Sequence, residues 1–136
     1  MTVSEIAPVR TGRVVVQGLV ATAVAVVLNV AVGLALRAAL GVDEAFLPLT
    51  PGAIAFFTLL SSLAGVVAYL IVRRWSARAF PIIAFGVAAV SLAGPLNLLR
   101  AGDADWEGLT TGAALALIPL HILPAVVLVV AFRRRQ

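Results

Sequence analysis

Long apolar stretches alternate with short polar segments along the whole chain. The apolar stretches cover about residues 14–36, 52–72, 80–99 and 109–132. Each holds about 20 residues or more, and at a rise of about 1.5 Å per residue such a helix crosses a hydrocarbon core of about 30 Å. Lipid offers the backbone no hydrogen-bond partner, and no stretch alternates like a strand of a membrane barrel. The pattern therefore predicts four membrane-spanning helices.

The connections between these stretches are short. Two of them, at about 37–51 and 100–108, lie at one end of the predicted helices, and the third, at about 73–79, lies at the other end. Short connections make neighbouring helices antiparallel. We therefore expect one all-α domain over residues 1–136, an integral membrane protein folded as an up-down-up-down four-helix bundle. The first stretch is longer than the apolar part of a cleavable signal, so we expect it to be retained.

The charged residues are divided unequally between the two ends. Five of the six acidic residues lie in the connections 37–51 and 100–108, which contain only two arginines. The other eight arginines flank the opposite end: Arg10, Arg13, Arg73, Arg74, Arg78, Arg133, Arg134 and Arg135. Because cytoplasmic loops carry an excess of basic residues, we expect both termini in the cytoplasm. The use of arginine without lysine in an Ala- and Val-rich chain is typical of GC-rich bacterial genomes. Together with the four spans, it leads us to expect a multi-pass protein of a bacterial inner (plasma) membrane.

The composition agrees with a membrane protein and argues against several other classes. Hydrophobic residues make up 62% of the 136 positions and charged residues 12%, whereas a soluble domain averages about half apolar and about a quarter charged. The net charge of +4 comes from clusters that flank the apolar stretches, so we expect no nucleic-acid partner. The lack of cysteine excludes disulfides and thiolate sites. The partner that this composition implies is the lipid bilayer.

A few polar residues interrupt the apolar stretches near the expected depth of the bilayer midplane. They are Ser61, Ser62, Ser91 and His121, and Asn29 lies somewhat nearer the end that is predicted to be outside. A neutral imidazole has one donor and one acceptor, and leaving them unpaired in hydrocarbon costs several kcal/mol. We therefore predict that His121 faces inward and exchanges hydrogen bonds with Ser61, Ser62 or Ser91. The five residues are candidates for a polar core or a ligand site.

The role of this histidine has two interpretations. It is either a structural residue of the core or a residue that binds a ligand, a proton or an ion. Every acidic residue of the chain lies outside the predicted spans. Since proton-coupled transporters usually place Asp or Glu in their path, this distribution weakens the case for proton transport.

Prolines bracket the single histidine. Pro119 and Pro124 each lack a backbone N–H, so the carbonyl groups one turn earlier, at Leu115 and Leu120, lose their helical donors. Membrane helices tolerate this loss where side chains or water bind the freed groups. We predict that the fourth helix is kinked at these prolines and that Pro95 bends the third helix.

Small and polar residues recur at helical spacing in the first two stretches. They are Gly18, Thr22, Asn29, Gly33 and Arg37 in the first, and Thr58, Ser61, Ser62, Gly65 and Ala68 in the second. Such stripes let helices approach closely and form hydrogen bonds with one another. The stripes are either packing faces or the lining of a polar cavity.

The second and fourth stretches share a weak similarity. At an offset of 60 residues, 49–74 and 109–134 have ten identical positions among 26, and Ser61 aligns with His121. Helices rich in Ala, Val and Leu also match by chance. A true duplication would make the two halves parallel repeats about the membrane normal.

The motifs of common enzyme classes are missing. The chain has no Gly-x-Ser-x-Gly turn and no phosphate-binding glycine loop. Ser61 and His121 offer a serine and a base, but no strained turn presents the serine. One histidine without cysteine or an acidic residue inside the spans makes no metal site. We expect no enzymatic activity, no metal and no cofactor.

The third and fourth stretches resemble a known family of bacterial membrane proteins. The resemblance lies in Ser91-Leu92-Ala93-Gly94-Pro95-Leu96 and in Leu120-His121, which is followed by an Ala- and Val-rich end. These segments are similar to the four-helix family named domain of unknown function 6069, which is common in actinobacteria. That family has methionine where Leu120 stands, and Pro119 is an addition. The resemblance implies a four-helix membrane fold and no particular reaction.

Two functions fit these observations. In the first, the bundle is a structural or interaction protein that pairs with itself or with another membrane protein through its small-residue faces. In the second, it is a small oligomeric transporter or channel whose path is lined by Asn29, the midplane serines and His121. A dry, filled interior favours the first function, and a groove that reaches His121 favours the second.

Overall fold

The computed structural model describes residues 11–101 and 106–133, and this part of the chain is all-α, as predicted. Its elements are α1 (Thr11–Leu40), η1 (Leu47–Leu49), α2 (Pro51–Ser76), η2 (Ala77–Ala79), α3 (Phe80–Ser91), α4 (Ala93–Ala101) and α5 (Thr111–Arg133). The described residues contain no strand. Of the arginines used to predict the orientation, Arg10, Arg134 and Arg135 lie outside the described ranges.

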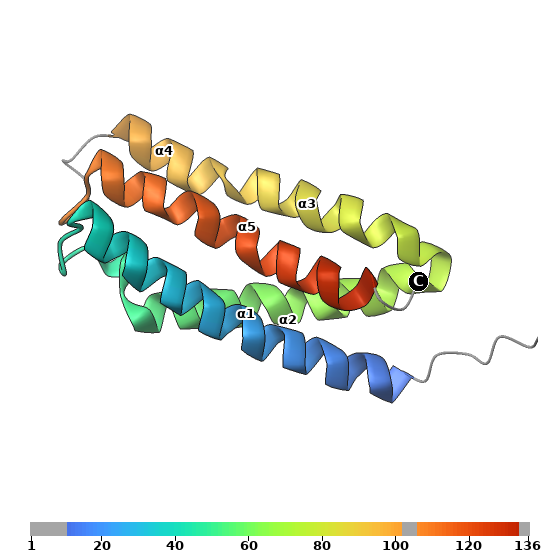
Figure 1. Ribbon diagram of the computed structural model, residues 1–136. Coiled ribbons are helices and arrows are strands. Elements are labelled where there is room, and N and C mark those ends of the chain that lie inside the picture. The colour runs from blue at the N-terminus through green and yellow to red at the C-terminus, as the bar shows by residue number, and fades with distance from the viewer. Residues whose placement is uncertain (1–10, 102–105, 134–136) are drawn as a thin grey trace, which may run out of the picture.

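Three helical stretches are long and apolar enough to cross a membrane. They are Thr11–Leu40, Pro51–Arg100 and Thr111–Arg133. The second stretch, 50 residues long, bends where Ser76 adopts an extended conformation (φ −160°, ψ 107°) before the short 3-10 segment η2. Figure 1 shows that α3 and α4 run back along the molecule from this bend, so that α2 and α5 begin at the same end.

Large apolar side chains cover the outside of these helices. Val27 of α1, Phe57 of α2 and Val90 of α3 are 68%, 64% and 76% exposed. The buried positions of α1 are mostly small or polar: Val14, Gly18, Ala21, Thr22, Ala25, Asn29 and Gly33. A soluble protein rarely exposes so large an apolar surface. Small residues between helices and large apolar residues outside are typical of helices that contact lipid.

The tightest packing lies between α1 and its two neighbours, α2 and α5. A Cβ atom on Gly18 would lie 2.6 Å from Cγ1 of Val66 in α2. A Cβ atom on Gly33 would overlap Ile54 in α2 and would lie 3.4 Å from Cδ1 of Leu120 in α5. The small-residue stripe of the first stretch is therefore a packing face, one of its two predicted interpretations.

The two ends of the molecule have separate apolar clusters. At the end that carries Arg13, Arg73 and Arg133, called the arginine end below, the cluster contains Tyr69, Phe80 and Phe132 among its buried residues. At the opposite end, called the acidic end after Asp43, Glu44 and Glu107, the cluster includes Phe46, Leu49 and Leu109. These clusters close the molecule at both ends of its long helices.

The segment α3–α4 packs differently from α1. It contacts mainly α5 and meets α2 chiefly beside η2, at the arginine end. The helix is interrupted at Leu92, whose N–H is shared between the carbonyl groups of Ala88 and Ala89. Pro95, three residues later, is buried. The third predicted stretch is thus two helices in the structure, and a groove separates them from α2.

Candidate functional site

The groove between α2 and α3–α4 has a volume of about 890 Å³. On α2 its lining extends from Ala53 to Ala68, a distance of about 22 Å at the helical rise. Phe57, Leu60 and Val87 lie on its rims and are 64%, 58% and 64% exposed, so the groove opens sideways onto the surface. Its size is near the upper end of the roughly 300–1,000 Å³ that is common for small-molecule sites.

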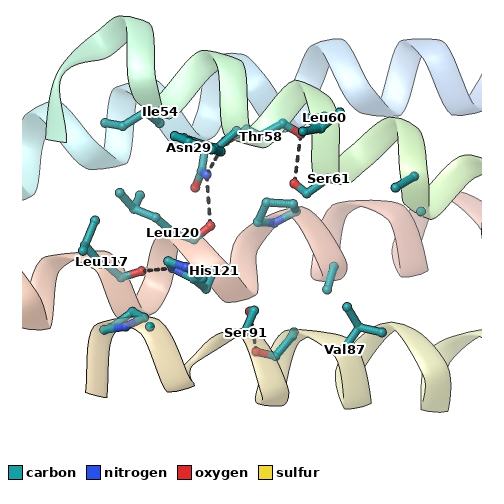
Figure 2. A pocket seen from close by; sticks show the side chains of 18 of the residues that line it. Asn29, Ile54, Thr58, Leu60, Ser61, Val87, Ser91, Leu117, Leu120 and His121 are labelled. Atoms are coloured by element: carbon teal, nitrogen blue, oxygen red, sulfur yellow. Dashed lines mark hydrogen bonds between the residues drawn. The ribbon is translucent and has the colours of Figure 1, made fainter. Parts of the chain in front are cut away.

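The floor of the groove is α5, and its central polar residue is His121 (Figure 2). The Nδ1 atom of His121 lies 2.8 Å from the carbonyl oxygen of Leu117, one turn earlier in the same helix. A carbonyl oxygen only accepts hydrogen bonds, so Nδ1 carries the proton and Nε2 of the neutral ring is an acceptor. This hydrogen bond stays within α5, so Nδ1 does not donate to a serine as predicted.

Ser61 and Ser91 line the groove from opposite walls, and Figure 2 shows them on α2 and α3 with α5 between. The hydroxyl of Ser61 donates to the carbonyl of Thr58 at 3.1 Å, and that of Ser91 donates to the carbonyl of Ala88 at 2.7 Å. Each serine thus satisfies its proton within its own helix. The two hydroxyl oxygens keep lone pairs that can accept.

Ser62 does not belong to this groove. It is fully buried on the face of α2 that also carries Thr58 and Val66, four residues before and after it, and this face packs against α1. Its hydroxyl oxygen has no hydrogen-bond partner among the described residues. Of the four residues predicted at mid-depth, three line the groove and Ser62 lies behind its α2 wall.

Asn29 of α1 connects three helices. Its Nδ2 donates to Oγ1 of Thr58 at 2.7 Å and to the carbonyl oxygen of Leu120 at 3.0 Å (Figure 2). That carbonyl is the one left without a helical donor by Pro124, so a side chain of α1 replaces the missing backbone N–H. Asn29 is only 2% exposed and forms part of the inner wall of the groove. Its role in joining α1 to the proline-containing helix was not anticipated from the sequence.

The three prolines singled out in the sequence lie in different surroundings. α5 is assigned as one continuous helix through Pro119 and Pro124. Pro124 is buried and lines the groove, whereas Pro119 is exposed outside it. Pro95 lines the groove near the acidic end and has no N–H to donate to the carbonyl of Ser91.

Aromatic residues mark the two ends of the groove. At the arginine end, Phe80 lines it and packs edge-on against Tyr69 and Phe132, with ring centroids 5.0 and 5.6 Å apart. Tyr69 and Phe132 stack at 3.9 Å. At the acidic end the groove is bordered by Trp106, which is 46% exposed, and by Pro48. The arginine end is thus closed by a packed aromatic cluster.

Few charged side chains form specific contacts in the described residues. Arg37, with 16% of its side chain exposed, lies 3.5 Å from Glu44 at the acidic end, and Arg73 donates to Thr11 at 2.8 Å at the arginine end. The orientation residues Arg73, Arg74, Arg78 and Arg133 all lie at or near the arginine ends of their helices. None of the charged residues that the structure describes lines the groove, and the same residues contain no cluster of potential metal ligands.

The two segments of the weak internal similarity occupy related places. Thr50 and Thr110 directly precede the first turns of α2 and α5, and their carbonyls accept from Ile54 and Ala114 at 3.0 Å. The aligned residues Ser61 and His121 line the same groove. α2 and α5 run in the same direction (Figure 1), as a duplicated hairpin requires.

Comparison with known proteins identifies a family and no activity. A family model described as a family of unknown function (DUF6069) matches residues 9–136, nearly the whole chain. No curated protein matches the chain. No solved structure matches it either.

Proposed function

This chain belongs to that family of unknown function, and we propose that it is a non-enzymatic membrane protein that binds an apolar-chain molecule in the groove between α2 and α3–α4. The observation that carries the proposal is the groove itself: about 890 Å³ of apolar-lined space in a molecule whose other helix contacts are close. Its long, narrow shape matches a hydrocarbon chain better than a compact solute. Its sideways opening gives such a molecule direct access from the bilayer.

The same proposal includes the membrane topology. The stretch Pro51–Arg100 is about 75 Å long at the helical rise, more than twice the thickness of a hydrocarbon core, and it bends near its middle. It therefore crosses the bilayer twice, which makes four crossings in an up-down-up-down bundle. The arginine end faces the cytoplasm of a bacterial cell, because basic residues are enriched on that side.

Binding accounts for the polar residues better than catalysis does. The hydroxyl protons of Ser61 and Ser91 are donated to carbonyl groups of their own helices, and His121 donates to its own helix as well. A serine nucleophile would instead donate to the base that activates it. The polar residues of the groove are therefore arranged to accept contacts from a bound molecule.

A photoreactive hydrocarbon tests this function directly. Vesicles that contain the protein are loaded with a sixteen-carbon alkane bearing a terminal diazirine, irradiated, and labelled residues are located by mass spectrometry. We expect enriched labelling of partly buried groove residues such as Ala84 and Ala125 over lipid-facing positions outside the groove. Ala64→Trp, which fills the groove, removes that enrichment, whereas Ala23→Trp, on an exposed position of α1, leaves it unchanged. Uniform labelling of all outer faces would refute the proposal.

A small oligomeric transporter is the second candidate function. The observation that favours it is that the groove reaches His121 from the acidic end. The aromatic cluster at the arginine end opposes it, because a path across the membrane must pass Phe80, which is 1% exposed. A liposome flux assay that compares wild type with His121→Ala separates the two functions. Flux above protein-free vesicles that depends on His121 supports transport, and background flux in both proteins excludes it for the solutes used.

A further inference from the structure

We infer that the groove selects a neutral apolar molecule that donates a hydrogen bond near the middle of its length, such as a long-chain secondary alcohol. This inference rests on the proposed function and specifies the chemistry of the molecule that is bound. It follows from which donors and acceptors of the groove residues are already paired within the protein.

Three polar side chains near the middle of the groove have used their donors and kept acceptors. The proton on Nδ1 of His121 is bound by the Leu117 carbonyl, so the ring offers Nε2 as an acceptor. The protons of Ser61 and Ser91 are bound by the carbonyls of Thr58 and Ala88, so both hydroxyls offer lone pairs. In all three cases the partner is a carbonyl oxygen, which fixes the direction of the hydrogen bond.

Backbone groups add to the same excess of acceptors. Pro95 leaves the carbonyl of Ser91 without its helical donor on a segment that lines the groove. Pro124 does the same for the carbonyl of Leu120, but Asn29 already donates to that group. The Nδ2 donor of Asn29 is thus occupied twice. The indole N–H of Trp106 remains at the acidic end, away from the middle of the groove.

The excess of acceptors has an energetic consequence in a membrane. An acceptor that faces hydrocarbon without a partner is costly, and lipid chains supply no donor. A bound hydroxyl donates its single proton to Nε2 of His121 or to one of the serine oxygens, and it removes this cost at that acceptor. A ketone or ether of the same shape provides no proton and leaves the acceptors unpaired.

The charge of the bound molecule follows from the groove lining. Within residues 11–101 and 106–133 no acidic side chain lines the groove, so a protonated amine would have no counter-ion at mid-depth. Burial of an unpaired charge is unfavourable by several kcal/mol in a site of this kind. A carboxylate would meet acceptors and no basic residue. A neutral donor is the chemistry that remains.

The place of the donor is set by the position of the polar residues. On α2 the groove extends about 12 Å from Ser61 to Ala53 and about 10 Å from Ser61 to Ala68. Apolar residues line both halves, so hydrocarbon extends from the polar centre toward both ends. A hydroxyl near the middle of a chain fits this arrangement better than one at its end.

Competition against the photoreactive alkane tests the inference. The competitors are a sixteen-carbon alcohol with its hydroxyl at mid-chain, the ketone of the same skeleton and the unsubstituted alkane, each added to the same vesicles at equal membrane concentration. In wild type we expect the alcohol to compete about three- to tenfold better than the ketone, as one net hydrogen bond implies.

Variants of the polar residues identify which groups accept the hydrogen bond from the alcohol. His121→Phe keeps a ring but removes Nε2, and we expect it to lower the difference between alcohol and ketone the most. His121→Gln keeps a donor for Leu117 and an acceptor for the groove, and we expect it to retain the difference. The double variant Ser61→Ala with Ser91→Ala keeps the histidine, and we expect it to lower the difference as well. The test therefore does not depend on whether His121→Phe folds. Ser62→Ala, behind the wall, is the matched control.

The outcomes distinguish a failure of the donor inference from a failure of the proposed function. If alcohol, ketone and alkane compete equally in wild type, the donor inference is wrong and the proposed function stands. If none of them reduces labelling of groove residues, both fail. If the alcohol is preferred but the preference survives undiminished in His121→Phe and in the double serine variant, the assigned acceptors are wrong.

Discussion

The two sides of α5 are built from similar residues but meet their neighbours in different ways. On one side, α1 approaches closely, and hydrogen bonds from Gln17 and Asn29 reach the carbonyls of Ala131 and Leu120 on α5. On the other side, α3–α4 leaves a groove above His121. Both sides of α5 are apolar, so apolar character alone does not determine which side packs closely and which side leaves a groove.

The difference lies in the small residues and in what they contact. In α1, Cβ atoms at Gly18 and Gly33 would overlap residues of α2, so these glycines allow the close approach. In α4, a Cβ atom on Gly94, which lines the groove, would meet nothing within 4 Å. Without a hydrophobic driving force between helices in lipid, close contact requires such matched small residues or a polar contact. α3–α4 has neither toward α2, and the groove follows.

The largest effect is expected from removing the aromatic closure of the groove. Phe80→Ala deletes a buried ring that contacts Tyr69 and Phe132, and we expect a loss of about 3–5 kcal/mol in the free energy of unfolding in mixed micelles. Phe56→Ala is the matched control, because that ring is 60% exposed and packs only edge-on against Phe57. Equal losses in the two variants would show that the cluster does not join α3 to the packed side.

The same variant has a second readout. Because the chain contains no cysteine, Ser61→Cys introduces a single thiol in the middle of the groove. We expect a water-soluble thiol reagent added at the arginine end to react faster with it when Phe80→Ala is also present. An unchanged rate would mean that another residue closes that end.

The next largest effect concerns the hydrogen bonds of Asn29. Asn29→Ala leaves the Leu120 carbonyl without a donor in a buried place, and we expect a loss of about 2 kcal/mol in unfolding free energy. Pro124→Ala restores a backbone N–H one turn after Leu120. In that background we expect the cost of Asn29→Ala to fall to about half, measured as a double-mutant cycle. Strictly additive losses would contradict the assignment of Asn29 as the replacement donor.

A smaller effect compares glycines from the two sides. Gly18→Ala places a methyl group against the β-branched Val66, and we expect a loss of about 1–3 kcal/mol in unfolding free energy. Gly86→Ala meets open space on a helix, and we expect a gain of up to about 1 kcal/mol from helix propensity. Opposite signs for one and the same substitution are the sharpest measure of the packing difference. Losses of equal size would show that the two glycines do not differ in packing.

The helices could be predicted from the sequence because length and hydropathy are enough for a segment that spans lipid. Their packing was harder to predict. An apolar residue that faces lipid and one that faces another helix look alike in the sequence, so the sequence pattern did not indicate the groove. The bend before Phe80 followed from Arg73–Ala79. The break at Leu92 divides the third stretch three residues before Pro95, the residue at which a bend was predicted.

The candidate site was found in part, and the error has a physical reason. Ser61, Ser91 and His121 do line one groove, as their common depth suggested. They do not donate to one another as predicted, because each side chain satisfies its proton with a carbonyl one turn earlier. Such local bonds need no particular distance between helices. The freed Leu120 carbonyl was predictable from Pro124, but its partner on α1 depended on the packing.

The smallest effect distinguishes two neighbouring serines on different faces of α2. Ser61→Ala removes an exposed hydroxyl whose bond is to its own helix, so we expect a change within about 0.5 kcal/mol in unfolding free energy. Ser62→Ala removes a fully buried hydroxyl that has no partner among the described residues, and we expect equal or higher stability, by up to about 1 kcal/mol. In the competition assay we expect the opposite order. Ser61→Ala weakens competition by the alcohol and Ser62→Ala does not, because only Ser61 lines the groove. A loss of alcohol competition in Ser62→Ala and not in Ser61→Ala would place the binding surface between α1 and α2, on the packed side.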